Sequence, residues 1–249
     1  MLKNIIVLLS LLISINSFAA DGKSLYEISS SFLGMPYEAD TLGCSERETV
    51  NMALESFDCV TFVEHSLALY MGGNYVSRTL TNLRYHDTPG CKSRNHFFVA
   101  DWLANNSLAY DISGFIARKY GLPVLGKTAA IDRTAWFKNI HNLDYSAPIQ
   151  EIEIPYIPAD ELLKTKLSAQ DFPAESLFLI VNKDTTIDIA HVGFLFNHNN
   201  TLIIQHASTS TMTVSKEPFE DYLKRIGKSK STLGIAIWGF GPGYIAPDK

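Results

Sequence analysis

The sequence predicts an α+β fold in which an antiparallel sheet packs against a helix that begins at Cys59. Apolar residues follow this cysteine at the spacing of one helix face, at Val60, Val63, Leu67 and Tyr70. Beyond Pro173 the chain changes to short β-branched and aromatic runs separated by turn-forming residues. Helical patterns come first and strand patterns later, an order typical of an antiparallel sheet with segregated helices. With 249 residues, 46% of them hydrophobic, the chain suffices for one domain with its own core.

The first 19 residues have the pattern of a cleavable secretion signal. Lys3 precedes an apolar stretch over residues 5–15, and Ser17 and Ala19 then place small residues at the usual cleavage spacing. The stretch is shorter than the roughly 20 apolar residues of a membrane span. We therefore expect a periplasmic or secreted protein without a stable membrane anchor, whose single domain occupies residues 20–249.

The elements before the sheet follow from apolar periodicity and from Gly and Pro breaks. The spacing predicts a short helix over residues 24–33, which Gly34 and Pro36 end. The helix at Cys59 comes next. Residues 72–173 then form a large, mainly helical insertion, with helices near 98–105, 111–120 and 159–167.

Four strands are predicted after this insertion, at residues 177–181, 190–196, 202–207 and 234–238. The middle two are joined by Asn197–Asn200, a strong signal for a hairpin turn. A pairing of Phe196 with Thr201 across this turn sets the register. His191 then lies opposite His206, with Cβ atoms about 5 Å apart on one face of the sheet. A shift of one residue would separate the two imidazoles.

The three cysteines differ in their surroundings. Cys44 and Cys91 lie among turn-forming residues, where a bridge suits an oxidising compartment, and the sequence leaves open whether they pair. Cys59 stands on the first turn of its helix, where free backbone N–H groups and the helix dipole favour a thiolate. This cysteine is either a nucleophile or a small buried residue.

A helix-start cysteine and two adjacent imidazoles match the needs of a thiol hydrolase. Such an enzyme uses a nucleophile, a base and a group that orients the base. The alternative is a half-buried histidine pair that stabilises the hairpin. The net charge is −5 and no long basic run occurs, so no nucleic-acid partner is expected.

Several short motifs resemble the NlpC-type cell-wall cysteine hydrolases, which are papain-like enzymes. The motifs stand in the family's order, at Gly34–Tyr37, Asp58–Cys59, His191–Phe194 and His206–Thr209. Longer strings resemble the N-acetylmuramoyl-L-alanine amidase-like branch, at Phe57–Glu64 and at Arg94–Phe98 with Asp101–Trp102. One departure is Glu175–Ser176, where these hydrolases often carry Gly-Asp before the first strand.

This resemblance implies a papain-like core in which Cys59 is the nucleophile, His191 the general base and His206 the residue that orients the base. It implies hydrolysis of the amide between N-acetylmuramic acid and L-alanine in muropeptides, through a thioester and without a metal or cofactor. The insertion at 72–173 is expected to build walls around the cleft and to set substrate choice.

Four further residues are candidate substrate contacts. The Gly-x-Pro-Tyr resemblance places Tyr37 near the cysteine. Arg94, His96 and Trp102 bring polar and aromatic groups into one short span, suited to a carboxylate or a sugar face. The alternative for these three is a solvated helix start followed by a core tryptophan.

Three other functions stay open. A metal hydrolase would use His86, Cys91 and His96, with His191 and His206 as further ligands, although the spacing fits no standard zinc signature. A D-glutamyl endopeptidase of the same superfamily would cut within the stem peptide with the same catalytic residues. A non-catalytic cell-wall binding module would keep the fold without the chemistry. The sequence indicates no particular oligomeric state.

Overall fold

A computed structural model describes residues 22–52 and 54–241. The expected secretion signal at residues 1–19 lies outside these ranges. Within them, no helix has the length and apolar character needed to cross a lipid bilayer.

An eight-stranded antiparallel sheet forms the centre of the described chain. Its strands are β1 Ala109–Asp111, β2 Leu125–Ile131, β3 Gln150–Pro158, β4 Glu175–Asn182, β5 His191–His198, β6 Thr201–Ser208, β7 Thr213–Pro218 and β8 Thr232–Phe240. Seven of them follow the order β2-β3-β8-β4-β5-β6-β7, and β1 pairs with β8. The four predicted strands are present as β4, β5, β6 and β8, and the predicted α+β class is confirmed.

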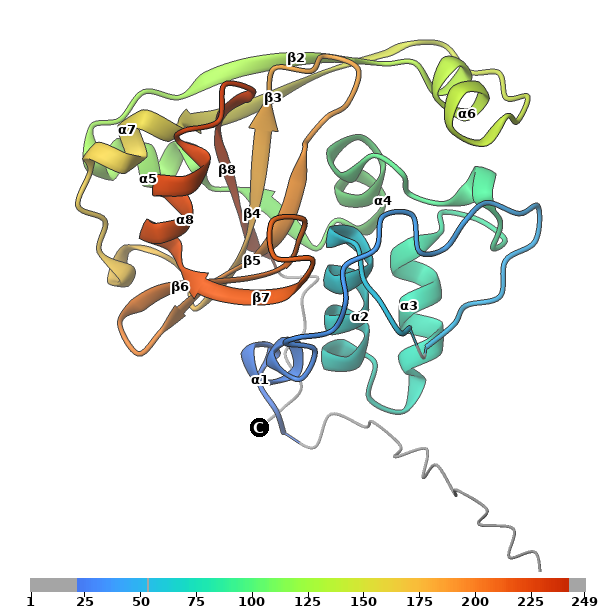
Figure 1. The fold of residues 1–249 in the computed structure, drawn as a ribbon, viewed down its shortest axis with the longest axis horizontal. Coiled ribbons are helices and arrows are strands. Elements are labelled where there is room, and N and C mark those ends of the chain that lie inside the picture. Colours follow the sequence, from blue (N-terminus) through green and yellow to red (C-terminus); the bar gives the residue numbers. More distant parts are fainter. Residues whose placement is uncertain (1–21, 53, 242–249) are drawn as a thin grey trace, which may run out of the picture.

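Helices cover both faces of this sheet (Figure 1). The helices are α1 Leu25–Ser30, α2 Cys59–Met71, α3 Val76–Arg84, α4 Ala104–Asn106, α5 Ser113–Tyr120, α6 Arg133–His141, α7 Ala159–Lys164 and α8 Phe219–Ile226, with a π-helix at Phe98–Leu103. One face packs against α1, α2 and α3, and the other against α5, α7 and α8. Within β4, Leu177 and Leu179 face α2, whereas Phe178 and Ile180 face α8. The two-residue repeat of the strands thus buries both faces.

A capping box defines where α2 begins. The Asp58 carboxylate accepts a hydrogen bond from the Thr61 N–H at 2.7 Å, and the Thr61 hydroxyl accepts one from the Asp58 N–H at 3.0 Å. Such a cap contributes about 1 kcal/mol and makes Cys59 the first helical residue. Phe62 then packs on Phe194 of β5, with ring centroids 5.6 Å apart. The helix that carries the cysteine is therefore seated on the sheet, as predicted.

The expectation of a mainly helical insertion at 72–173 is wrong in part. The strands β1, β2 and β3 lie within it, and β2 and β3 form a long ribbon that carries α6 toward the α2 side of the molecule (Figure 1). The strand pattern of β2 is obscured because Lys127 occupies a buried position. Its ammonium donates to the side chain of Asn182 and to the carbonyls of Ile187 and Asp188, which makes that burial tolerable.

The β5–β6 hairpin differs from the predicted register by two residues. His198 pairs with Thr201, so the turn contains only Asn199 and Asn200. Both asparagines have positive φ, 50° and 58°, which asparagine tolerates and a tight hairpin turn of this kind requires. Side-chain direction repeats every two residues, so the two candidate histidines still share a face. They are diagonal neighbours and not directly opposite.

Candidate functional site

Cys59 carries the free thiol of the chain. The structure joins Cys44 to Cys91 in a disulfide and leaves Cys59 partly exposed at the start of α2. Desolvation and the adjacent Asp58 carboxylate raise the pKa of the Cys59 thiol to about 12, although backbone N–H groups at the helix start and at Val192 lower it. Loss of water thus outweighs the favourable N–H groups of the helix start in setting this pKa.

The beginning of β5 approaches this thiol. The backbone N–H of Val192 donates a hydrogen bond to Cys59. Val192 directly follows His191, the first residue of the strand. An ionised Cys59 would also raise the pKa of Tyr222 on α8, whose ring lies 5.3 Å from the ring of His206. The structure thus brings the cysteine and both predicted histidines into one region.

The two histidines contact each other directly. His191 Nε2 and His206 Nδ1 lie 2.7 Å apart. This diagonal contact depends on Gly193, because a Cβ there would lie 2.8 Å from the Cβ of His206. Burial, and then the charges of His206 and Arg225, lower the pKa of His191 to about 3. His191 is therefore neutral at pH 7.

A carboxylate extends the polar contacts behind His206. Nε2 of His206 lies 3.2 Å from Oε1 of Glu217 on β7, and Arg225 of α8 donates two hydrogen bonds of 2.6 Å to the Glu217 carboxylate. Neither residue stands out in the sequence, since β7 buries only Val214 and has no apolar run. The apolar spacing within 219–223 could have revealed α8.

Tyr37 lies close to the cysteine. It forms an isolated bridge with Phe57, just before the helix cap. Burial, followed by the charges of Cys59 and Asp58, raises the pKa of Tyr37 to about 12. Its hydroxyl is protonated at neutral pH and can donate a hydrogen bond.

A cavity of about 220 Å³ opens beside the first turn of α2. It is lined by Asp40, Leu42, Asp58, Val60, Thr61, Glu64, Arg94, Asn95, His96, Trp136, Ile140 and His141. The ring of Trp136 on α6 lies 4.5 Å from that of His96 and 5.5 Å from that of Phe97. These contacts hold α6 against the cavity wall that contains Arg94, Asn95 and His96. The cavity therefore combines aromatic surface with convergent polar groups, as ligand sites do.

Two predicted contacts, Arg94 and His96, belong to this wall. The Arg94 guanidinium pairs with the Glu48 carboxylate and donates to the Gly43 carbonyl at 3.0 Å. Burial lowers the pKa of His96 to about 4, and its Nε2 lies 2.7 Å from the carbonyl oxygen of Cys91. Both side chains are thus held in place by the protein itself.

Trp102 does not reach the cavity. Its side chain is 0% exposed and stacks on Phe98 with ring centroids 4.8 Å apart. It belongs to the hydrophobic core, so in this structure it cannot contact a substrate. Trp136, which no sequence motif marks, provides the aromatic surface instead.

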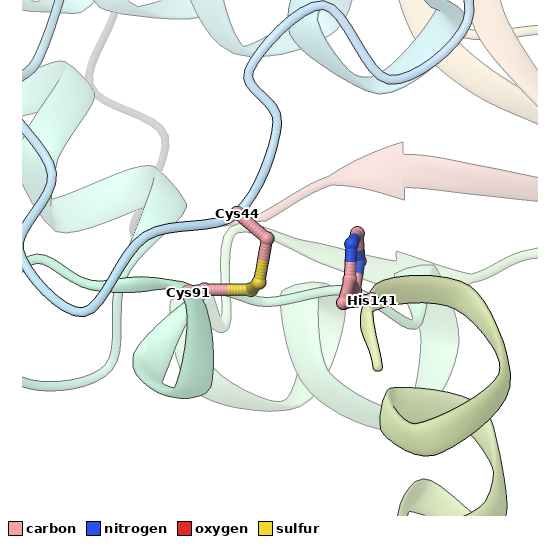
Figure 2. A group of neighbouring side chains, drawn as sticks. All are labelled: Cys44, Cys91 and His141. Carbon is pink, nitrogen blue, oxygen red and sulfur yellow. A yellow bond between two sulfur atoms is a disulfide. The ribbon is translucent and has the colours of Figure 1, made fainter. Parts of the chain in front are cut away.

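The disulfide lies at the same wall. Figure 2 shows His141, at the end of α6, beside the bridge between Cys44 and Cys91. Their potential ligand atoms lie within 4.8 Å of one another, as a metal site would require. The two sulfurs are bonded to each other, however, so neither is the free thiolate that zinc binds. This group includes neither His191 nor His206.

The fold and the site define an α+β protein with a free cysteine at a helix start and a histidine pair on adjoining strands. Residues 27–231 match the model of the family described as N-acetylmuramoyl-L-alanine amidase-like. The chain belongs to this family, and membership supports a peptidoglycan amidase-like function. No curated protein matches the chain.

Solved structures share the fold over most of the chain. Protein LPG0564 of Legionella pneumophila is 24% identical, with a TM-score of 0.75 and 88% of each chain covered. An N-acetylmuramoyl-L-alanine amidase from Bacteroides uniformis is 23% identical, with a TM-score of 0.67 over 88% of this chain and 98% of that one. A candidate xylanase from Bacteroides fragilis is 21% identical, with a TM-score of 0.67 over 85% and 98%. Identities this low show a common fold only.

Proposed function

We propose that this chain is a secreted or periplasmic cysteine amidase that hydrolyses the amide between N-acetylmuramic acid and L-alanine in muropeptides. One observation carries the proposal: a free helix-start thiol and a hydrogen-bonded histidine pair lie in one region of a chain from the amidase-like family. We assign the core to the NlpC-type, papain-like superfamily. Residues 20–249 then form one catalytic domain, within which 72–173 build the substrate walls.

His191 is the general base of the first half-reaction. It is neutral, and it takes the proton of the Cys59 thiol as the sulfur attacks the amide carbonyl carbon. Backbone N–H groups at the helix start stabilise the oxyanion that forms. The C–N bond then breaks, the amine leaves with the proton from His191, and the muramyl side stays on the sulfur as a thioester.

Water completes the cycle. His191 removes a proton from a water molecule as the water oxygen attacks the thioester carbon. The C–S bond breaks, and the proton returns to the sulfur. The products are a muramyl carboxylic acid and a peptide with a free L-alanine amine. His206 orients His191 throughout, through the 2.7 Å hydrogen bond.

We assign the cavity beside α2 to the substrate. Trp136 offers a ring face on which a sugar or an apolar peptide side chain can pack. Arg94 and His96 add polar groups beside this ring, and Tyr37 places a hydroxyl near the thiol. This arrangement suits a ligand that carries both a sugar and a peptide.

Mass spectrometry of defined muropeptides tests the proposal. The protein is expected to release the intact stem peptide and a free muramyl sugar, and Cys59→Ala is expected to release neither. His86→Ala, which removes an exposed imidazole, is the control and should retain full activity. Cleavage inside the stem would make the chain a D-glutamyl endopeptidase, and binding without any cleavage would make it a binding module.

A further inference from the structure

The side chains behind His206 form a continuous hydrogen-bonded series that the catalytic scheme above does not use. His206 pairs with Ser215 across the β6–β7 ladder, so Glu217 reaches His206 from the diagonal position on β7. Arg225 on α8 donates one hydrogen bond to each Glu217 oxygen, both at 2.6 Å. Burial opposes ionisation, but the hydrogen bonds from His206 and Arg225 lower the pKa of Glu217 to about 2. The carboxylate is therefore charged at any pH near neutral.

This charge determines where the protons of the two imidazoles lie. An ionised carboxylate can only accept, so Nε2 of His206 carries the hydrogen in the 3.2 Å contact with Glu217. A neutral His206 then has a bare Nδ1, and this atom must accept from Nε2 of His191, 2.7 Å away. His191 is left with an unprotonated Nδ1, the atom that can take a proton from a thiol.

The other groups packed around His206 do not supply such a constraint. The ring of Phe178 from β4 lies 6.0 Å away and is apolar. The ring of Tyr222 from α8 lies 5.3 Å away, and burial raises the pKa of its hydroxyl, so it is uncharged. Of these described neighbours, Glu217 with its partner Arg225 is therefore the charged group in contact with His206.

We propose that Glu217, held by Arg225, is a positioning residue that sets the tautomers of His206 and His191 and stabilises the imidazolium that forms during turnover. The inference rests on the proposed roles of Cys59 and His191. Glutamine at this position has one acceptor oxygen where glutamate uses two. That oxygen can still accept from His206 and from one Arg225 nitrogen, as Oε1 of Glu217 does, but the amide NH2 cannot accept the second Arg225 hydrogen bond, and the negative charge is lost.

The test compares Glu217→Gln with Glu217→Asp and with Glu220→Gln. The last is the matched control, since Glu220 lies on α8 with an exposed side chain paired to Lys224. Two readouts are used: kcat and KM for muropeptide cleavage, and the pH profile of Cys59 alkylation by iodoacetamide. The second needs no substrate and reports the base directly.

Glu217→Gln is expected to lower kcat about 100-fold or more with little change in KM, since loss of the correct tautomer in a comparable triad costs up to about 10⁴-fold. Alkylation at pH 7 should slow at least about tenfold, and its inflection should move to higher pH. Glu217→Asp should recover part of both, and Glu220→Gln should behave as wild type. If Glu217→Gln does not fold, Arg225→Gln takes its place and is expected to slow alkylation as well.

Two outcomes separate this inference from the proposed function. Wild-type kcat and an unchanged alkylation profile in Glu217→Gln would overturn the positioning role and leave the amidase proposal standing. A wild-type protein that cuts no muropeptide, but whose alkylation still slows in Glu217→Gln, would support the positioning role and reject the proposed substrate. For Arg225→Gln, wild-type alkylation would likewise overturn the inference.

Discussion

Replacing Gly193 by alanine tests whether the histidine pair depends on the absence of a side chain between its members. The new Cβ would lie 2.7 Å from Cε1 of Phe178, 2.8 Å from the carbonyl oxygen of Gln205 and 2.8 Å from the Cβ of His206. Real Cβ atoms essentially never approach other heavy atoms this closely. Two of these three atoms belong to β6 close to its main chain, so they cannot rotate out of the way.

The expected cost follows from this crowding. Strand β6 or the ring of Phe178 must move by roughly half an ångström, and overpacking of this kind costs about 1–3 kcal/mol. The movement carries His206 away from His191 and lengthens their 2.7 Å hydrogen bond. Because misplacement of a catalytic group by about 1 Å can cost about 100-fold in rate, kcat should fall by about that factor.

Urea unfolding and muropeptide cleavage measure the two effects. Gly114→Ala is the matched control, because a Cβ at Gly114 meets nothing within 4 Å and alanine favours the helix α5 by about 0.5–1 kcal/mol. Gly114→Ala should therefore be neutral or slightly stabilising and fully active. A Gly193→Ala protein as stable and as active as Gly114→Ala would refute the diagonal geometry.

Three further outcomes are expected. His191→Ala should lower kcat at least about 10³-fold in the mass-spectrometric assay, while exposed His86→Ala leaves it unchanged; equal rates in both variants would remove His191 as the base. The Cys44→Ser/Cys91→Ser double variant removes a bridge that spans 47 residues, so the free energy of unfolding should fall by about 4 kcal/mol in urea, and a loss below about 1 kcal/mol would contradict this. The pKa of His191 falls from its ordinary 6.5 to about 3, so the unfolded chain binds a proton that the folded chain does not. The stability linked to an unprotonated His191 is therefore fully present above about pH 6.5 and is lost as the pH falls toward 3. In His191→Ala, which lacks this group, melting temperatures should decline less steeply over the same window.

Much of the fold was predictable because local patterns and tertiary packing agree. The apolar spacing after Cys59 marks α2, and the cap at Asp58 explains why the cysteine begins the helix. The strands β4, β5, β6 and β8 are apolar runs bounded by turns, so their existence is visible without partners. The strand β2 was missed because Lys127 interrupts its pattern, and the burial of this lysine makes sense only once the acceptors from another part of the chain are in place.

The sequence by itself determined the chemical types at the site, namely a helix-start cysteine and two histidines that share one sheet face. The shared face survives the two-residue error in register, because the side-chain repeat of a strand is also two. The tertiary structure alone decided the rest: the Glu217 and Arg225 behind His206, the burial of Trp102 and the place of Trp136 in the cavity wall. These depend on which strands and helices pack together over long separations in the chain, and no local periodicity carries that information.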